Sequence, residues 1–149
     1  MSIRIYFNDM LGTIPEDWCR TSNLMINKDR TQVIFGGLLF MGISCRTVSV
    51  EDADKIKTEH DILTKSVISA DIISHFATKQ LTIFFNLINY ISSVLKADFA
   101  VYYEDTPVII RKDGNLLISV SLTNKSILPF DTAPLLAQLH TEYKTAEKL

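Results

Sequence analysis

The chain has 149 residues, a formal net charge of −2 and a hydrophobic content of 47%. A chain of this length is expected to form one domain, 1–149, which buries roughly two-thirds of its unfolded surface without disulfides or a metal. Its 15 basic residues are scattered among 17 acidic ones, whereas phosphate neutralisation needs a concentrated basic face. The charge pattern therefore argues against a nucleic-acid partner.

Two features predict a cytoplasmic protein. The opening MSIRIYFNDMLG has charged and polar residues where a signal peptide needs an apolar block. The two cysteines, Cys19 and Cys45, do not make a disulfide framework and are expected to be free thiols. Because Cys45 lies in an apolar run, we expect it to pack as a small hydrophobic residue.

The N-terminus is predicted to form a short strand. Ile3, Ile5 and Phe7 alternate with Arg4 and Tyr6, a pattern typical of a strand with one buried face.

The next segments are predicted to be a loop followed by strands. Residues 8–31 show no regular period, apart from a helical turn that could open at Pro15. The stretch 32–50 is β-branched and aromatic. It is predicted to form two strands, or one long bent strand, with Gly36 and Gly37 at the turn or bulge.

Two helices are predicted in the centre of the chain, from about residue 51 to 76 and from about Thr78 to Leu95. Acidic residues open the first of them, where they suit a helix N-terminus. The apolar stretch 81–95 spans about 22 Å as a helix, short of the roughly 30 Å hydrocarbon core of a membrane. The second helix is therefore expected to lie in a protein core.

The apolar surface of this second helix is wide. Its polar residues form one narrow stripe on a helical wheel, namely Thr82, Asn86, Asn89 and Ser93. Such a helix is buried around most of its girth and meets water along one edge. One flank of the apolar arc could also serve a second subunit, so a homodimer is one hypothesis.

A β-meander is predicted over 98–122, with turns at Glu104–Pro107 and at Asp113-Gly114. Glycine tolerates the positive φ that a type I′ hairpin demands. In the last strand the alternating apolar residues are expected to share one face, with serines on the other; these apolar residues are Leu116, Ile118, Val120 and Leu122.

A final helix is predicted after Asp131 or Thr132, with Pro134 in its first turn. Its apolar stripe would be Leu135, Leu136, Leu139, Tyr143 and Ala146. The order of elements predicts an α+β fold in which helices cover one face of a mainly antiparallel sheet.

The histidines and carboxylates of the first predicted helix do not make a metal site. His60 and Asp71 would lie about 16 Å apart along the axis, too far to share one ion. Asp71 and His75, four residues apart, could chelate together, but this spacing is more typical of a surface hydrogen bond on a helix. We therefore predict no metal and no cofactor.

Catalytic motifs are weak. The stretch 37–44 has the glycine spacing of a phosphate-binding loop, but Ile43 stands where the lysine is needed. Neither Cys19 nor Cys45 has a recognisable catalytic neighbourhood. A non-enzymatic role is therefore favoured. The alternative is an enzyme or small-molecule binder with a pocket between sheet and helices, where His60, Asp71, His75 or Cys45 would act.

The polar side of the predicted sheet is the candidate surface for a partner protein. It would carry Arg4, Tyr6, Arg46 and Tyr102. These residues suit a binding surface, because aromatic side chains and arginine contribute most to the binding free energy of protein interfaces. Trp18 could anchor a partner from its loop, or it could fold back and fill the edge of the core.

In size, charge and composition the chain is similar to the immunity proteins that neutralise bacterial toxins and to dimeric secretion chaperones. This general resemblance implies a small protein that binds another protein. The leading hypothesis is therefore a protein-binding module that occludes or holds its partner, as an inhibitor or immunity-type protein does. A homodimeric, chaperone-like protein is the further alternative.

Overall fold

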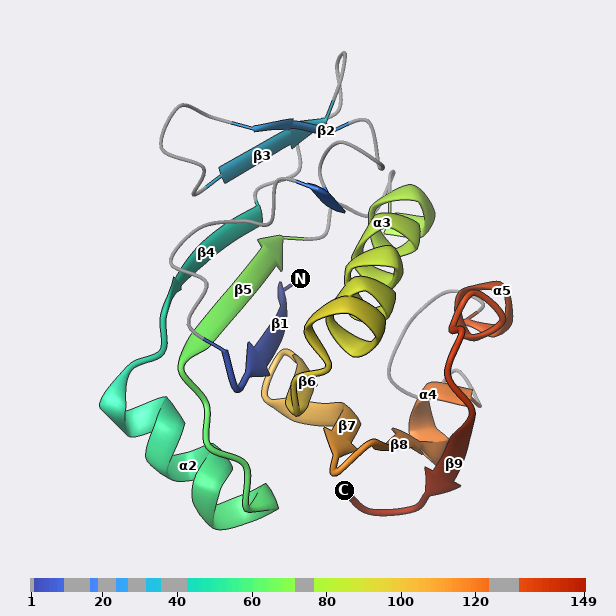
Figure 1. Cartoon of the computed structure of the whole chain (residues 1–149). Helices are drawn as coiled ribbons and strands as arrows, with labels where there is room; N and C mark the ends of the chain where they lie inside the picture. Colours follow the sequence, from blue (N-terminus) through green and yellow to red (C-terminus); the bar gives the residue numbers. More distant parts are fainter. Residues whose placement is uncertain are drawn as a thin grey trace.

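The computed structural model of the chain describes residues 2–9, 17–18, 24–26, 32–35, 43–71, 77–123 and 132–149. Nine strands of this part form one sheet in the order β2-β3-β4-β5-β1-β6-β7-β8-β9 (Figure 1). The strands are β1 (Ser2–Phe7), β2 (Leu24–Ile26), β3 (Gln32–Phe35), β4 (Ile43–Thr47), β5 (Ser66–Asp71), β6 (Phe99–Tyr103), β7 (Thr106–Lys112), β8 (Asn115–Ser119) and β9 (Tyr143–Ala146).

The sheet is mainly antiparallel, as predicted. Every neighbouring pair is antiparallel except β8 and β9, which run parallel. β1 lies between β5 and β6, so the N-terminal strand joins two segments that follow it much later in the chain. Ile5 in this strand is opposite Ile68 on one side and Val101 on the other. The α+β class is therefore confirmed.

Helix α3 (Ala77–Tyr90) covers one face of the sheet and continues as a π-helical segment, Ile91–Leu95 (Figure 1). It presents several fully buried side chains to the main core, among them Leu81, Phe84 and Leu87. Ile3, Ile5, Phe7 and Trp18 belong to the same cluster. The helix predicted from Thr78 to Leu95 is thus present, and it packs in the core as expected.

Helix α2 (Val50–His60) covers part of the opposite face. Tyr6, Ala100 and Ile110 point away from α3 and are buried in a second cluster with Ile56 of α2 and with Ile62. The prediction that helices cover only one face is therefore wrong. The side chains of β1 alternate between the two faces of the sheet. On the α2 side the polar-looking Tyr6 is covered and buried, whereas Arg4, two residues earlier, is only half-buried.

The first central helix is shorter than predicted. Ser49 caps the start of α2 by accepting a hydrogen bond from the Asp52 N–H, and the helix ends at His60, where Asp61 takes a left-handed conformation with φ 55°. Ser66–Asp71 forms β5 and not a continuation of the helix. Its β-branched residues lie between β4 and β1, where a strand gains ladder bonds on both sides.

The C-terminal helix prediction is also wrong beyond its first turn. α5 spans only Ala133–Leu136, with Thr132 at its N-cap position. Tyr143–Ala146, which were expected to continue the helix, form the strand β9 instead. Tyr143 in this strand is exposed. β8 ends at Ser119 and is followed by the helical turn α4 (Val120–Thr123), so Val120 does not extend the strand.

Two predicted hairpins are present. Asp113 and Gly114 both have positive φ, 52° and 83°, between β7 and β8, as a type I′ turn requires. Glu104 also has positive φ, 52°, in the turn between β6 and β7. In the stretch 32–50 the chain forms two strands, β3 and β4, while the predicted glycine turn lies outside the described residues.

Asn89 is not part of a wet stripe on α3. It is buried, its amide nitrogen donates to the Gln138 carbonyl at 2.7 Å, and its oxygen accepts from the His140 N–H at 3.0 Å. The polar residue that looked like a solvent contact therefore ties α3 to the segment after α5. A side-chain amide can be buried in this way when its N–H and C=O groups are hydrogen-bonded.

No helix in the described segments is long and apolar enough to cross a bilayer.

Candidate functional site

Six polar or aromatic residues share the sheet face on the α2 side. Arg4 lies opposite Tyr102 of β6 on one side and opposite Ser69 of β5 on the other. Ser69 in turn lies opposite Ser44 of β4. Because side chains alternate between the faces of a strand, Tyr6 and Arg46 lie on this same face, two residues further along β1 and β4. The face holds both arginines of the predicted partner surface.

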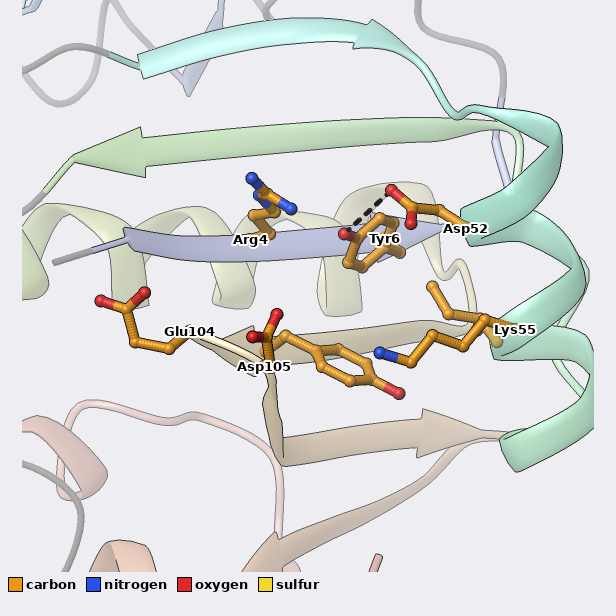
Figure 2. Close-up of a pocket in the computed structure, with 8 residues that line it drawn as sticks. Arg4, Tyr6, Asp52, Lys55, Glu104 and Asp105 are labelled. Carbon is orange, nitrogen blue, oxygen red and sulfur yellow. Dashed lines mark hydrogen bonds between the residues drawn. The ribbon is translucent and has the colours of Figure 1, made fainter.

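A small hollow opens on this face beside α2 (Figure 2). Its volume is about 40 Å³, and its lining is mostly charged or aromatic. The lining residues are Arg4, Tyr6, Asp52, Lys55, Ile56, Tyr102, Glu104 and Asp105. Pockets that hold organic ligands are roughly 300–1,000 Å³. The hollow is therefore large enough for water or a single functional group, and not for an organic substrate.

The two tyrosines of the face are held by α2. Tyr6 Oη donates to Asp52 Oδ2 at 3.4 Å, the contact drawn in Figure 2. Tyr102 Oη donates to Glu59 Oε2 at 2.8 Å and lies 2.7 Å from His60 Nε2. The rings of Tyr6 and Tyr102 meet edge to face at 5.7 Å. Both tyrosines are buried, so they position the site and offer little surface themselves.

The cations of the site remain accessible. Arg4 is half-buried, and its pKa is raised mainly by a hydrogen bond with Tyr6. Its Nε is buried and has no acceptor among the described residues. Lys55 Nζ lies 5.2 Å from the centre of the Tyr102 ring, in the range of a cation–π contact. Arg46 is exposed on β4, separated from β1 by one strand.

Carboxylates border the same hollow. Glu104 and Asp105 are exposed in the turn between β6 and β7, and Glu104 Oε1 accepts from the Ser2 N–H at 2.9 Å. Figure 2 shows Asp105 between Glu104 and Lys55. The site therefore presents both signs of charge at close range, a pattern suited to a partner that has complementary charged groups.

The structure separates the other candidate residues. Trp18 is buried with 2% of its surface exposed, so it does not project from a loop as an anchor. Cys45 is buried on the α3 side, where burial raises the pKa of its thiol to about 11 and makes it a poor nucleophile. His60 lies on the α2 side. Asp71 is exposed at the end of β5, and His75 lies outside the described residues.

The described members of this set, His60, Cys45 and Asp71, do not come together as a metal or catalytic centre. Asp71 is in a strand, so the predicted helical pairing of Asp71 with His75 is wrong in its geometry. His60 and Cys45 lie on opposite sides of the sheet. Within the ranges that the structure describes, no group of three or more His, Cys, Asp or Glu side chains could hold a metal ion.

Sequence reasoning missed the contribution of α2 to the site. Asp52 was interpreted only as part of an acidic helix start, and Lys55 and Glu59 were given no role, yet each of the three contacts a tyrosine of the sheet. Their spacing of three to four residues places them on one helix face. That spacing was visible in the sequence, but nothing in it showed that this face would lie against β1 and β6.

The end of α2 is tied to the β7–β8 hairpin through Asp61. Its carboxylate accepts from Lys57 and, at 2.8 Å, from Lys112. These hydrogen bonds, first the one from Lys112 and then the one from Lys57, lower the pKa of Asp61 to about 2. Both lysine contacts are solvent-exposed, so their effect on stability is small.

An Asp61→Asn variant is expected to weaken the response of the fold to acid. Because the pKa of Asp61 is lower in the folded state, its contribution is complete above the unfolded value of about 3.9 and is lost as the pH falls toward the folded one. Asparagine tolerates the left-handed backbone at this position. Thermal unfolding of both proteins from neutral to acidic pH should show a small deficit in the variant that closes near the folded pKa. A deficit that is constant with pH would contradict this origin.

Comparison of the chain with protein-family models, with curated proteins and with solved structures gave no match.

Proposed function

We propose that the chain is a non-enzymatic protein-binding module that occludes or holds a partner protein, as an inhibitor or immunity-type protein does. The observation that carries this proposal is the pair of arginines on the open part of one sheet face. Arg46 is exposed, and Arg4 is half-buried. Arginine is among the residues that contribute most to protein interfaces.

The geometry around Arg4 favours a surface contact over catalysis. The adjoining hollow of about 40 Å³ does not enclose an organic substrate. Lys55, Glu104 and Asp105 surround it with charges that can set the orientation of a partner. Tyr6 and Tyr102 are buried beneath α2, and we assign them the role of positioning Arg4 and Lys55. We also propose a cytoplasmic location, in keeping with the free thiol of Cys45.

A small-molecule binder is the second candidate. A more open hollow of about 560 Å³ lies between the end of α2, the strands β7 and β8 and the last residues of the chain. Its lining residues are Glu59, Thr106, Pro107, Ser119, Ser121, Glu147, Lys148 and Leu149. Its volume falls in the range of ligand pockets. It differs from the pocket expected between sheet and helices, because none of His60, Asp71 and Cys45 lines it and only Glu59 among its lining residues belongs to α2.

The arginine surface is tested by capture of a partner from the source lysate with three baits. The wild-type chain and a Lys144→Ala control, altered at an exposed position on the distant strand β9, should retain the same stoichiometric protein. The Arg4→Ala/Arg46→Ala variant should lose it, with affinity reduced by at least about 2 kcal/mol, or about 30-fold, if either arginine is a hot spot. Circular dichroism of the free variant checks that its fold is intact.

Retention of the partner by the double variant would contradict this surface. The absence of any captured protein with all three baits would instead favour the second candidate, and ligand screening against the hollow beside Glu59 would follow.

A further inference from the structure

Helix α2 is attached to the sheet more by polar contacts than by apolar burial. Ile56 is the one buried residue of the helix. Four hydrogen-bonded pairs also join the helix and its C-cap residue Asp61 to the strands, beside the contact of Lys55 with the Tyr102 ring. Each pair contains a group that can gain or lose a proton; they are Tyr6–Asp52, Tyr102–Glu59, Tyr102–His60 and Asp61–Lys112. The docking of α2 is therefore open to control by pH.

His60 occupies a defined position in this set. The Tyr102 hydroxyl donates its proton to Glu59 Oε2, so its oxygen must accept the hydrogen bond from His60 Nε2 at 2.7 Å. This direction assigns the proton of the neutral imidazole to Nε2. A further proton would have to enter at Nδ1, on a side chain that is only 5% exposed. The neutral ring therefore satisfies the contact, and charging it adds nothing to the bond with Tyr102.

The groups around His60 partly oppose one another. Burial is the largest influence and lowers the pKa of His60, with Lys55 acting in the same direction. The Glu59 carboxylate, 3.7 Å away, favours the charged ring, as does the C-terminal end of the helix. From the sheet, burial raises the pKa of Tyr102, which keeps it neutral.

Charged residues further from His60 have little influence on whether its ring is protonated. Lys112 on β7 is engaged by Asp61. Glu147 and Lys148, from the last residues of the chain, line the hollow next to Glu59 and carry opposite charges.

We propose that α2 is a pH-sensitive cover that leaves the sheet when the imidazole of His60, which contacts Tyr102, becomes protonated. Docking retains its full stability above the usual histidine pKa of about 6.5. It loses stability as the pH falls through that value toward the lower pKa of the docked ring, because the undocked helix then binds the proton more readily.

Opening of the cover would expose an aromatic and aliphatic patch on the sheet. Tyr6, Val67, Ala100, Tyr102 and Ile110 are all buried in the cluster beneath α2. The main core on the α3 side shares no residue with this cluster. The helix can therefore open as a local unit while the rest of the fold remains closed. Tyr6 and Tyr102 also adjoin the arginine surface, but the test of the cover measures the docking of α2 and not the binding of a partner, so the two proposals can fail separately.

Hydrogen exchange of the α2 amides tests the cover. Protection of the peptide over 50–60, corrected for intrinsic rates, is compared at about pH 7.5 and about pH 5.5, on either side of the usual histidine pKa. In the wild type it should fall by up to about tenfold per pH unit, the limit for uptake of one proton. Protection of α3 should not change.

Two variants separate His60 from other groups. His60→Gln keeps an N–H donor for Tyr102 and does not titrate, so its α2 protection should be equal at both values. The control His140→Gln alters an exposed histidine and should behave as the wild type. Equal protection of wild-type α2 at both values, or an equal loss in His60→Gln, would overturn the proposal.

If His60→Gln does not fold, the ring of His60 is titrated in the wild type by NMR. A pKa of His60 below the usual histidine value of about 6.5, with α2 amide shifts following the same curve, supports the cover. A pKa at or above that value overturns it.

Discussion

Replacement of Trp18 by alanine is expected to lower the free energy of unfolding by about 3–5 kcal/mol, the usual cost of truncating a large buried aromatic residue. Trp18 is 2% exposed and lies in the main core cluster with residues of α3 and of the central strands. Truncation removes buried apolar area and leaves a cavity that the neighbouring rigid elements fill only in part.

Urea unfolding at neutral pH measures this effect, with Tyr143→Ala as the control. Tyr143 is 39% exposed on the edge strand β9, so its truncation should change stability by no more than about 0.5 kcal/mol. Trp18 is the one tryptophan of the chain, and its fluorescence reports unfolding of the wild type directly. Circular dichroism must follow the variant that lacks it.

The same measurement decides between the two hypotheses for Trp18. An anchor for a partner would leave the isolated fold intact and weaken only a complex. A Trp18→Ala protein with wild-type stability would therefore contradict the core assignment and return Trp18 to the candidate binding surface.

Replacement of Phe84 by alanine is the second large effect, with an expected loss of about 3–5 kcal/mol. Phe84 has no exposed surface and belongs to the cluster that joins α3 to the central strands. It lies near the middle of α3, where a cavity would be surrounded by other core residues. The loss of stability comes from the apolar area that the Phe84 ring no longer buries. It also comes from the cavity, which the surrounding helix and sheet cannot close.

Asn86→Ala is the matched control for Phe84→Ala. Asn86 lies two residues further along the same helix and is exposed. Alanine has the higher helix propensity, so Asn86→Ala should be neutral or slightly stabilising, by less than about 0.7 kcal/mol. Comparable losses in both variants would show that the helix, and not its packing, was affected. A loss below about 1 kcal/mol for Phe84→Ala would contradict its place in the core.

Several elements could be predicted because their signals are local. The alternation in β1 and the Asp113-Gly114 turn each depend on residues close together in the chain. The apolar arc of α3 is likewise a short-range pattern, and it predicted a core helix correctly. Asn89 was the exception on that helix, because its partners at Gln138 and His140 lie about 50 positions away in the sequence.

The incorrect predictions share a physical cause. Residues 66–71 and 143–146 were both assigned to helices, and both form strands. A strand acquires its hydrogen bonds from neighbours elsewhere in the chain, so its stability depends on tertiary pairing. Here β5 is held between β4 and β1, and β9 pairs with β8 alone.

By itself the sequence determined the α+β class, the central helix and the two hairpin turns, because periodicity and glycine placement act over a few residues. It also determined that Arg4 and Tyr6 would share a face of their strand. Only the tertiary structure decided that α2 covers that face, because the contacts of Asp52, Lys55 and Glu59 join positions about 40 or more apart. The free energy of such contacts depends on the docking of whole elements, which a local pattern does not specify.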